Sequence, residues 1–164
     1  MADLVFSIKT VTIGDVVDNI TNWASRTNVR DIGVTQGGAT ITMEATNLEI
    51  NSDQNMDPEA TVLTGYPKTI TVNALDLVPA NLALAFGGTV DGTTVNIPAA
   101  VTISEKSVEI KTKSETGLVE KTIKIPRCSI IPSSNINLNN SGAAVLVFTG
   151  KVLSPSAGNA VQIA

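Results

Sequence analysis

The residues best spaced to bind an ion lie in a short acidic segment, residues 53–57, with the sequence Asp-Gln-Asn-Met-Asp. Carboxylate or amide side chains stand at its first, third and fifth positions, which is the spacing of oxygen ligands in a helix–loop–helix calcium site. The pattern then fails, because Pro58 stands where that loop requires glycine and Thr64 where it requires a bidentate glutamate. We therefore expect a solvated turn, with a weak oxygen-ligand ion site as the alternative.

Catalytic chemistry has few candidate residues in this sequence. It contains no histidine, which removes the usual neutral-pH base and the commonest transition-metal ligand, and one cysteine cannot build a zinc site. Arg127 precedes Cys128 and could lower the pKa of its thiol, yet a thiol without a base partner is more typical of a packing residue. The glycine pairs at 37–38 and 87–88 lack the context of a phosphate-binding loop. We predict no catalytic residue, no cofactor, no metal ion and no enzymatic activity.

The composition favours a single domain rich in β-strands. Aromatic residues make up only 3% of the 164 residues, so the core must be built from Val, Ile, Leu and Ala, which suits strand packing. A formal charge of -4, without any run of Lys or Arg, argues against tight binding of nucleic acid. The start of the sequence lacks the plan of a signal peptide, and no apolar run reaches the roughly 20 residues of a membrane helix. We expect a chain folded in a cytoplasm, with no membrane span.

The clearest helix signal lies at residues 75–88, with the sequence LDLVPANLALAFGG. Pro79 suits a first helical position, and Gly87 and Gly88 can adopt the left-handed conformation that ends a helix. Between them runs an apolar stripe of Leu82, Ala83, Ala85 and Phe86. A helix this short is marginal alone in water, so we expect it to pack against a larger β structure.

Alternating apolar residues predict strands throughout the rest of the chain. Shifts of the apolar phase near Lys9 and Asn47 predict bulges. The best hairpin joins the expected strands at residues 101–113 and 118–126, with Val108 opposite Ile123 if the connection between them is symmetric. The expected strands cover residues 4–13, 41–50, 70–74, 101–113, 118–126 and 143–153.

Two segments are expected to make contacts beyond a simple core. Residues 51–68 contain Asp, Asn, Gly and Pro and are predicted to form a long polar loop, and loops of that length tend to be functional or contact-making. In the last strand, Val145 and Val147 point to one side while Leu146 and Phe148 point to the other, so both faces need cover.

These patterns predict a mainly β, antiparallel fold, a β-sandwich or a partly closed barrel with one short flanking α-helix. We expect one domain over residues 1–164. It would comprise an N-terminal segment to about residue 38, the long loop at 51–68 and a short C-terminal tail at 155–164.

Three stretches together resemble bacteriophage tail tube proteins, the major tail proteins of tailed phages. The first runs from the Asp31-Ile32-Gly33 motif through Gly37-Gly38 into a strand and the Asp53-Gln54 pair. The second is VPANLALAFGG at residues 78–88, and the third is the late hairpin followed by the strand at 143–153. One departure concerns the helix start. The family often places Ser and an acidic residue around the helical proline, where this chain has Val and Ala, so the helix should be less well capped.

The resemblance implies a structural virion protein that assembles through its β-strands into hexameric rings, stacked as a hollow tube. Phage DNA would pass through the lumen into the host without specific binding, and the tube, assembled in the host bacterial cytoplasm, would contact other tail proteins. The loop at 51–68 and the N-terminal segment would make contacts between rings. The residues to which we assign assembly or packing are Asp53, Gln54, Pro79, Leu82, Phe86, Gly87, Gly88, Val145 and Val147.

Two other functions stay open from the sequence. The tube of a contractile injection or secretion system would use the same architecture to pass effectors in place of DNA. A β-sandwich that binds carbohydrate or a receptor is the alternative from another class. Such carbohydrate sites usually present aromatic platforms, and this chain has one Trp and one Tyr.

Overall fold

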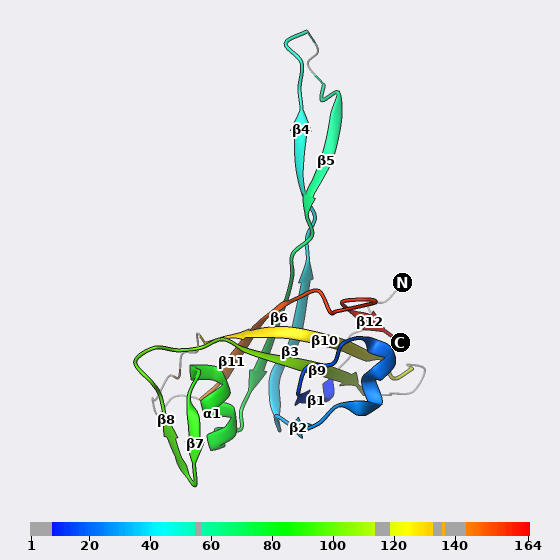
Figure 1. The fold of residues 1–164 in the computed structure, drawn as a ribbon. Helices are drawn as coiled ribbons and strands as arrows, with labels where there is room; N and C mark the ends of the chain where they lie inside the picture. The colour runs from blue at the N-terminus through cyan, green and yellow to red at the C-terminus, as the bar shows by residue number, and fades with distance from the viewer. Residues whose placement is uncertain (1–7, 55–56, 114–118, 133–135, 137–143) are drawn as a thin grey trace.

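The computed structural model describes residues 8–54, 57–113, 119–132, 136 and 144–164, and its main feature is one antiparallel sheet (Figure 1). Across this sheet the strands follow in the order β2-β1-β9-β10-β11-β6-β3, with β12 beside β10. The bounds are β1 (Ile8–Gly14), β2 (Arg30–Asp31), β3 (Thr35–Met43), β6 (Lys68–Ala74), β9 (Ser104–Thr112), β10 (Thr122–Ile131), β11 (Leu146–Val152) and β12 (Gln162–Ile163). The predicted mainly β, antiparallel fold is confirmed.

The sheet bends strongly but does not close among the residues described. In Figure 1, β9 and β10 cross in front of β3 and β6. Buried side chains from β1, β6, β9, β10 and β11 form one hydrophobic cluster. The two ends of the strand order, β2 and β3, are not paired with each other. The partly closed barrel therefore remains a prediction, whereas the antiparallel sheet with a flanking helix is observed.

Strand alternation explains the core. In β6, Ile70, Val72 and Ala74 are buried, while the residues between them are half-buried, as expected of a strand with one face inward. The neighbouring strands contribute the same kind of branched side chain. The core residues on these strands are Val11, Ile13, Ile70, Val72, Ala74, Val108, Ile110, Ile125, Cys128, Ile130, Leu146, Phe148 and Val152.

A bulge lets β10 run past a proline. The pairing of β10 with β9 shifts between Ile125 and Cys128, which leaves Pro126 unpaired in the ladder, where its missing N–H does no harm. Its carbonyl accepts a hydrogen bond from the Val17 N–H at 3.2 Å. The expected end of this strand at residue 126 is therefore wrong, since the strand continues to residue 131.

The expected register of the main hairpin is also wrong, by two residues. Ile123 lies opposite Ile110 and not opposite Val108. A shift of two keeps every side chain on its own face, so the apolar pattern alone does not distinguish the two registers. The predicted bulges at Lys9 and just before Asn47 are confirmed by shifts of register at both positions.

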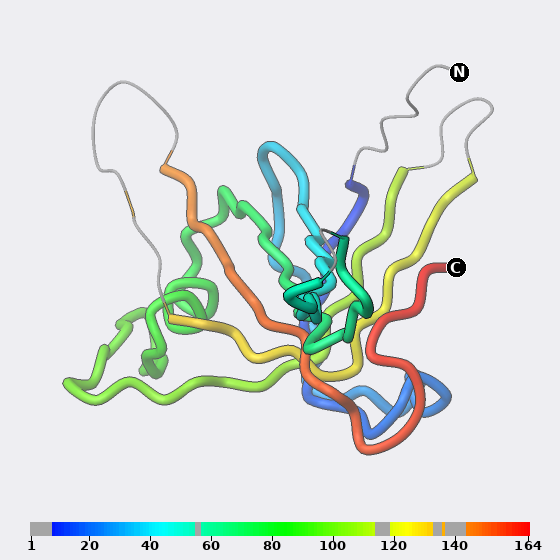
Figure 2. Tube along the Cα trace, turned by 90° about the horizontal axis from the view of Figure 1, so that it is seen from above, coloured from blue at the N-terminus to red at the C-terminus, as the bar shows by residue number. Residues whose placement is uncertain are grey.

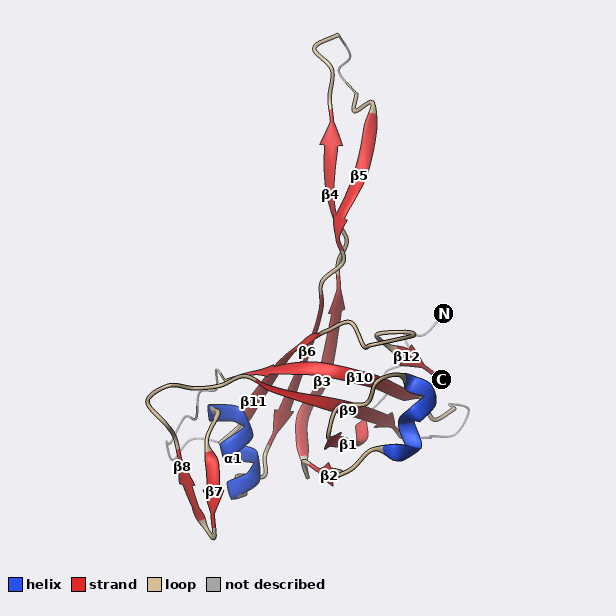
Figure 3. Cartoon of the chain, in the orientation of Figure 1, coloured by secondary structure: helices blue, strands red, loops and turns tan. Residues whose placement is uncertain are grey.

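The helix α1 (Pro79–Phe86) begins and ends where the sequence predicts. Gly87 has a φ of 69° in the left-handed region, and the Gly88 N–H bonds to the Ala83 carbonyl at 2.7 Å. No side chain caps the helix start at Val78, as expected. The helix packs beside a small hairpin, β7 (Thr89–Asp91) and β8 (Thr94–Asn96), and against β10 and β11 (Figure 3).

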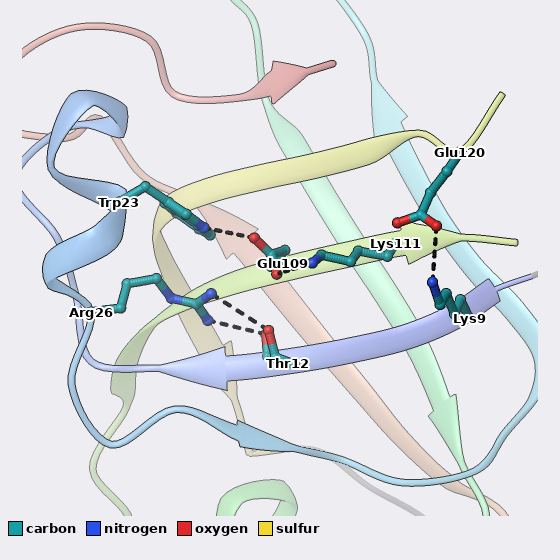
Figure 4. Close-up of polar contacts among 7 residues, drawn as sticks. All are labelled: Lys9, Thr12, Trp23, Arg26, Glu109, Lys111 and Glu120. Atoms are coloured by element: carbon teal, nitrogen blue, oxygen red, sulfur yellow. Dashed lines mark hydrogen bonds and ion pairs between the residues drawn. The ribbon is translucent and has the colours of Figure 1, made fainter. Parts of the chain in front are cut away.

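A polar network fixes the 3-10 helix η1 (Ile20–Ser25) to the outer face of β1 and β9 (Figure 4). The Trp23 indole N–H donates to the Glu109 carboxylate at 2.7 Å, and the Arg26 guanidinium lies 4.4 Å from the centre of the Trp23 ring. Arg26 also donates to the Thr12 side chain, and Lys111 lies 3.7 Å from Glu109. Charged side chains thus keep this face polar, while the opposite face forms the core.

Replacing Gly87 by alanine should destabilise the fold more than the same change at Gly92. Both residues have positive φ, so each substitution forces an alanine into the left-handed region at about 1 to 2 kcal/mol. A Cβ at Gly87 would also lie 2.1 Å from a Val101 methyl and 3.1 Å from the Pro132 ring, whereas a Cβ at Gly92 meets nothing within 4 Å. Overpacking at Gly87 should add about 1 to 3 kcal/mol. Equal losses of unfolding free energy in urea would contradict this packing.

Candidate assembly interface

The most prominent surface feature is a β-hairpin that projects far from the body of the protein (Figures 1 and 3). It consists of β4 (Thr46–Ile50) and β5 (Ala60–Gly65), which continue β3 and β6 beyond the sheet. The Glu44 N–H bonds to the Pro67 carbonyl at 3.3 Å and links the two ladders. We call residues 44–66 the arm. Seen from above, the arm points toward the viewer and lies near the centre of the Cα trace (Figure 2).

The arm corrects our expectation of a long polar loop at 51–68. The Thr-Val-Leu-Thr run after Pro58 pairs with β4 as a strand, so the middle of the expected loop is β5, with connections before Ala60 and at residues 66–67. The β-branched residues of that run were the sequence signal for a strand. The many Asp, Asn and Pro residues around it masked this signal.

One face of the arm is apolar and exposed. Leu48 lies opposite Val62 and Ile50 opposite Ala60, and residues that are paired or two apart share a face. Leu48 is 58% exposed, and Ile50 and Val62 are each 47% exposed. We call these four residues the arm face. A two-stranded ribbon is marginal alone in water, which makes this exposed apolar face a candidate contact surface.

The arm also concentrates negative charge. It contains five carboxylates and no Lys or Arg, so it carries -5 while the whole chain carries -4, and the remaining residues together carry +1. The carboxylates are those of Glu44, Glu49, Asp53, Asp57 and Glu59. Charge and apolar surface are therefore combined on the same projecting element.

A second candidate surface is an apolar groove of about 530 Å³ at the end of the sheet from which the arm leaves. One wall is β3, and the other is formed by β1, β9, β10 and β12. The walls separate because β11 pairs with β10 only from Cys128 to Ile131, while β12 takes its place beside the first half of β10. We call this surface the seam groove. Its lining residues are Ile8, Ala39, Ile41, Met43, Ile110, Thr112, Lys121, Ile123 and Ile163.

The lining of the seam groove itself contains one charged side chain, that of Lys121. Lys68 lines an adjoining hollow that shares Met43 and Ile163 with the groove. A further hollow, which shares Ile8 with the groove, carries both signs of charge, from Lys9, Lys113, Asp31 and Asp76. The charge in the groove lining is therefore opposite in sign to that of the arm, and both surfaces expose apolar side chains.

The helix end of the molecule is held by a buried polar residue that the sequence analysis missed. Asn81 is fully buried in α1, and its amide donates to the carbonyls of Ile32 and Asp76, each at 2.9 Å. Arg30 donates to the Asn81 side-chain oxygen and, at 3.0 Å, to the Ala80 carbonyl. Partial burial lowers the pKa of this guanidinium. The sequence did contain a signal for this network, namely an Asn within an apolar helix, because a buried amide needs hydrogen-bond partners.

The structure separates the predicted assembly residues into two groups. Leu82 and Phe86 are half-buried against the core, and Val145 and Val147 lie half-buried in or beside β11, which contacts the same helix. Pro79, Gly87 and Gly88 are also half-buried and form the helix ends. Asp53 and Gln54 are exposed in the turn at the tip of the arm, on the opposite side of the molecule from α1 (Figure 1). Residues 55 and 56 of the proposed ion loop lie outside the described residues.

The structure contradicts an activated thiol at Cys128. The thiol is fully buried in the core, and burial raises its pKa to about 12. Arg127 points to Glu105, with hydrogen bonds of 2.7 and 2.9 Å, and these lower the pKa of the Glu105 carboxyl. The guanidinium thus interacts with a carboxylate on the neighbouring strand.

Comparisons with known proteins add no assignment. The chain matches no protein-family model and no curated protein sequence. Within the described ranges, no helix is long and apolar enough to cross a membrane.

Cys128 should be unreactive in the folded protein. With a pKa of about 12 the thiol is almost entirely protonated at pH 8, and the thiolate is the reactive form. A thiol reagent should modify the native chain slower than the urea-unfolded chain by a factor on the order of 100 or more. Stoichiometric labelling of the native protein at the unfolded rate would show that the core is open at this residue.

Proposed function

We propose that this chain is the subunit of a bacteriophage tail tube. Copies assemble into hexameric rings, the rings stack into a hollow tube, and the lumen conducts phage DNA into the host. The observation that carries this proposal is the arm, an exposed hairpin whose apolar face has no cover in the described part of one copy. The mainly β fold with one short flanking helix and the motifs that resemble tail tube proteins support it.

The mechanism of such a subunit is geometric and needs no catalytic step. The described part of β3 pairs with β6 along one edge only, and a strand edge that is left open invites pairing with another chain. Joining edges between copies would satisfy these backbone groups and extend the sheet around a ring. The helix end, held by Asn81 and Arg30, would keep its shape during assembly because its buried polar groups are already paired.

The charge suits a conduit for DNA. Affinity for the phosphate backbone comes mainly from Lys and Arg, and this chain has a net charge of -4. A lumen built from such subunits would hold passing DNA weakly. The tube would reside in the virion tail after assembly in the host bacterial cytoplasm, in contact with other tail proteins and without enzymatic activity.

Electron microscopy of the purified chain tests this proposal. At high concentration we expect negatively stained rings or tubes from the unmodified chain and few or none from a Leu48→Ser/Val62→Ser variant. Leu63→Ser is the matched control, because Leu63 lies on the same hairpin, is 65% exposed and points to the other face. All three chains should unfold within about 0.5 to 1 kcal/mol of one another, since the altered side chains are exposed. Small monodisperse particles from the unmodified chain would count decisively against a tube subunit.

A further inference from the structure

The seam groove and the arm face are complementary in chemistry. Apart from Thr112 and Lys121, the groove is lined by Ile, Ala and Met side chains, and the arm face presents Leu, Ile, Ala and Val. Burying these two surfaces against each other would remove apolar area from water on both sides, which is the main driving force for association. An arm cannot enter the groove of its own copy, because it leaves the body at Met43 in the groove wall and projects away from it (Figure 1).

Charge decides between two ways of covering the arm face. Two arms packed face to face would bring two charges of -5 close to each other without a single Lys or Arg on either arm, and like charges at short range repel. An arm in the seam groove instead meets Lys121 and, beside it, Lys68. In the described part of the chain Lys121 forms no ion pair, so its ammonium is available to an incoming carboxylate.

We infer that the arm of one copy lies in the seam groove of a second copy, with the arm face on Ile41, Ile110 and Ile123. Opposite charge orients the arm, and apolar contact holds it. This pairing rests on the proposed function in that the partner is another copy of the chain. The two surfaces differ, so repetition of the contact yields a ring or an open chain of subunits, whereas two copies that exchange arms reciprocally close into a dimer.

Disulfide cross-linking between two tagged copies tests the pairing. One copy carries Leu48→Cys and the other Lys121→Cys, and Cys128 adds little background because it is fully buried. Mild oxidation should link the two tags, since a disulfide needs the Cα atoms within about 7 Å. The matched pair Leu63→Cys with Lys121→Cys places the thiol on the other face of the arm and should give about a tenth of the product or less. Equal yields from the two pairs would overturn the inference.

A mixing experiment distinguishes arm-to-groove from arm-to-arm contact. Val62→Asp blocks the arm face and Lys121→Glu adds charge repulsion at the groove, so neither variant alone should assemble. Mixed together, each pair retains one intact arm and one intact groove, and light scattering should detect dimers that do not grow. Association of the Lys121→Glu variant alone, or disulfide-linked pairs of two Leu48→Cys copies, would show that arms pair with each other and overturn the inference. A mixture that does not associate would overturn it as well.

A further control concerns the chain's own first residues as the occupant of the groove. Removing residues 1–7 should leave the Leu48–Lys121 cross-link unchanged, whereas a several-fold rise would assign the groove to that segment and overturn the inference. The two proposals can fail separately. Rings without the Leu48–Lys121 cross-link would leave the tube subunit standing, and the cross-link without rings or tubes would leave the pairing standing alone.

Discussion

Backbone hydrogen bonding at the edges of the sheet is the constraint on which the rest of this structure depends. β3 and β6 keep pairing beyond the body as β4 and β5, because each further pair satisfies N–H and C=O groups that would otherwise need water. This solution creates a new difficulty, since a two-stranded ribbon has little core of its own. Natural proteins usually blunt such edges with charge or cover. Here Glu49 adds a charge to β4 and Glu44 lies just before it, while the arm face stays exposed, so charge protects the arm against indiscriminate pairing and leaves one apolar face open.

The opposite end of the molecule meets the same constraint in a different way. α1 follows β6 in the chain and packs against one end of the sheet. The Asn81 side chain donates hydrogen bonds to the backbone carbonyls of Ile32 and Asp76, which lie outside the helix. Arg30 in β2 completes the network. Because every member of this network has a partner, it specifies how the helix sits on the sheet. The molecule therefore has one end fixed by buried polar contacts and another end that presents apolar surface.

The sequence predicted the elements better than their pairing. α1 was predicted with both its ends, because Pro79 and Gly87 act through local backbone geometry. The mainly β class and two bulges followed from alternation, a local property as well. The hairpin register was wrong by two residues, since such a shift leaves the apolar pattern unchanged. The arm and the seam groove were not predicted. The arm is a strand pair in a polar sequence context, and the groove exists only because β11 and β12 share one edge of β10, a long-range feature that no local pattern encodes.

The negative charge of the chain is concentrated on the arm, and this would influence how two copies associate. Arms that each carry -5 repel at distances below the Debye length, roughly 8 to 10 Å at physiological ionic strength, so free copies would be kept from pairing through their apolar arm faces. A lysine beside an apolar groove removes that repulsion at one place only. Electrostatics of this kind mainly sets which contact forms and how fast, while the apolar area sets how long it lasts. In the proposed pairing both surfaces lie on every copy, so one contact type would be enough to build an assembly of any length, and the angle between arm and groove would decide whether it closes into a ring.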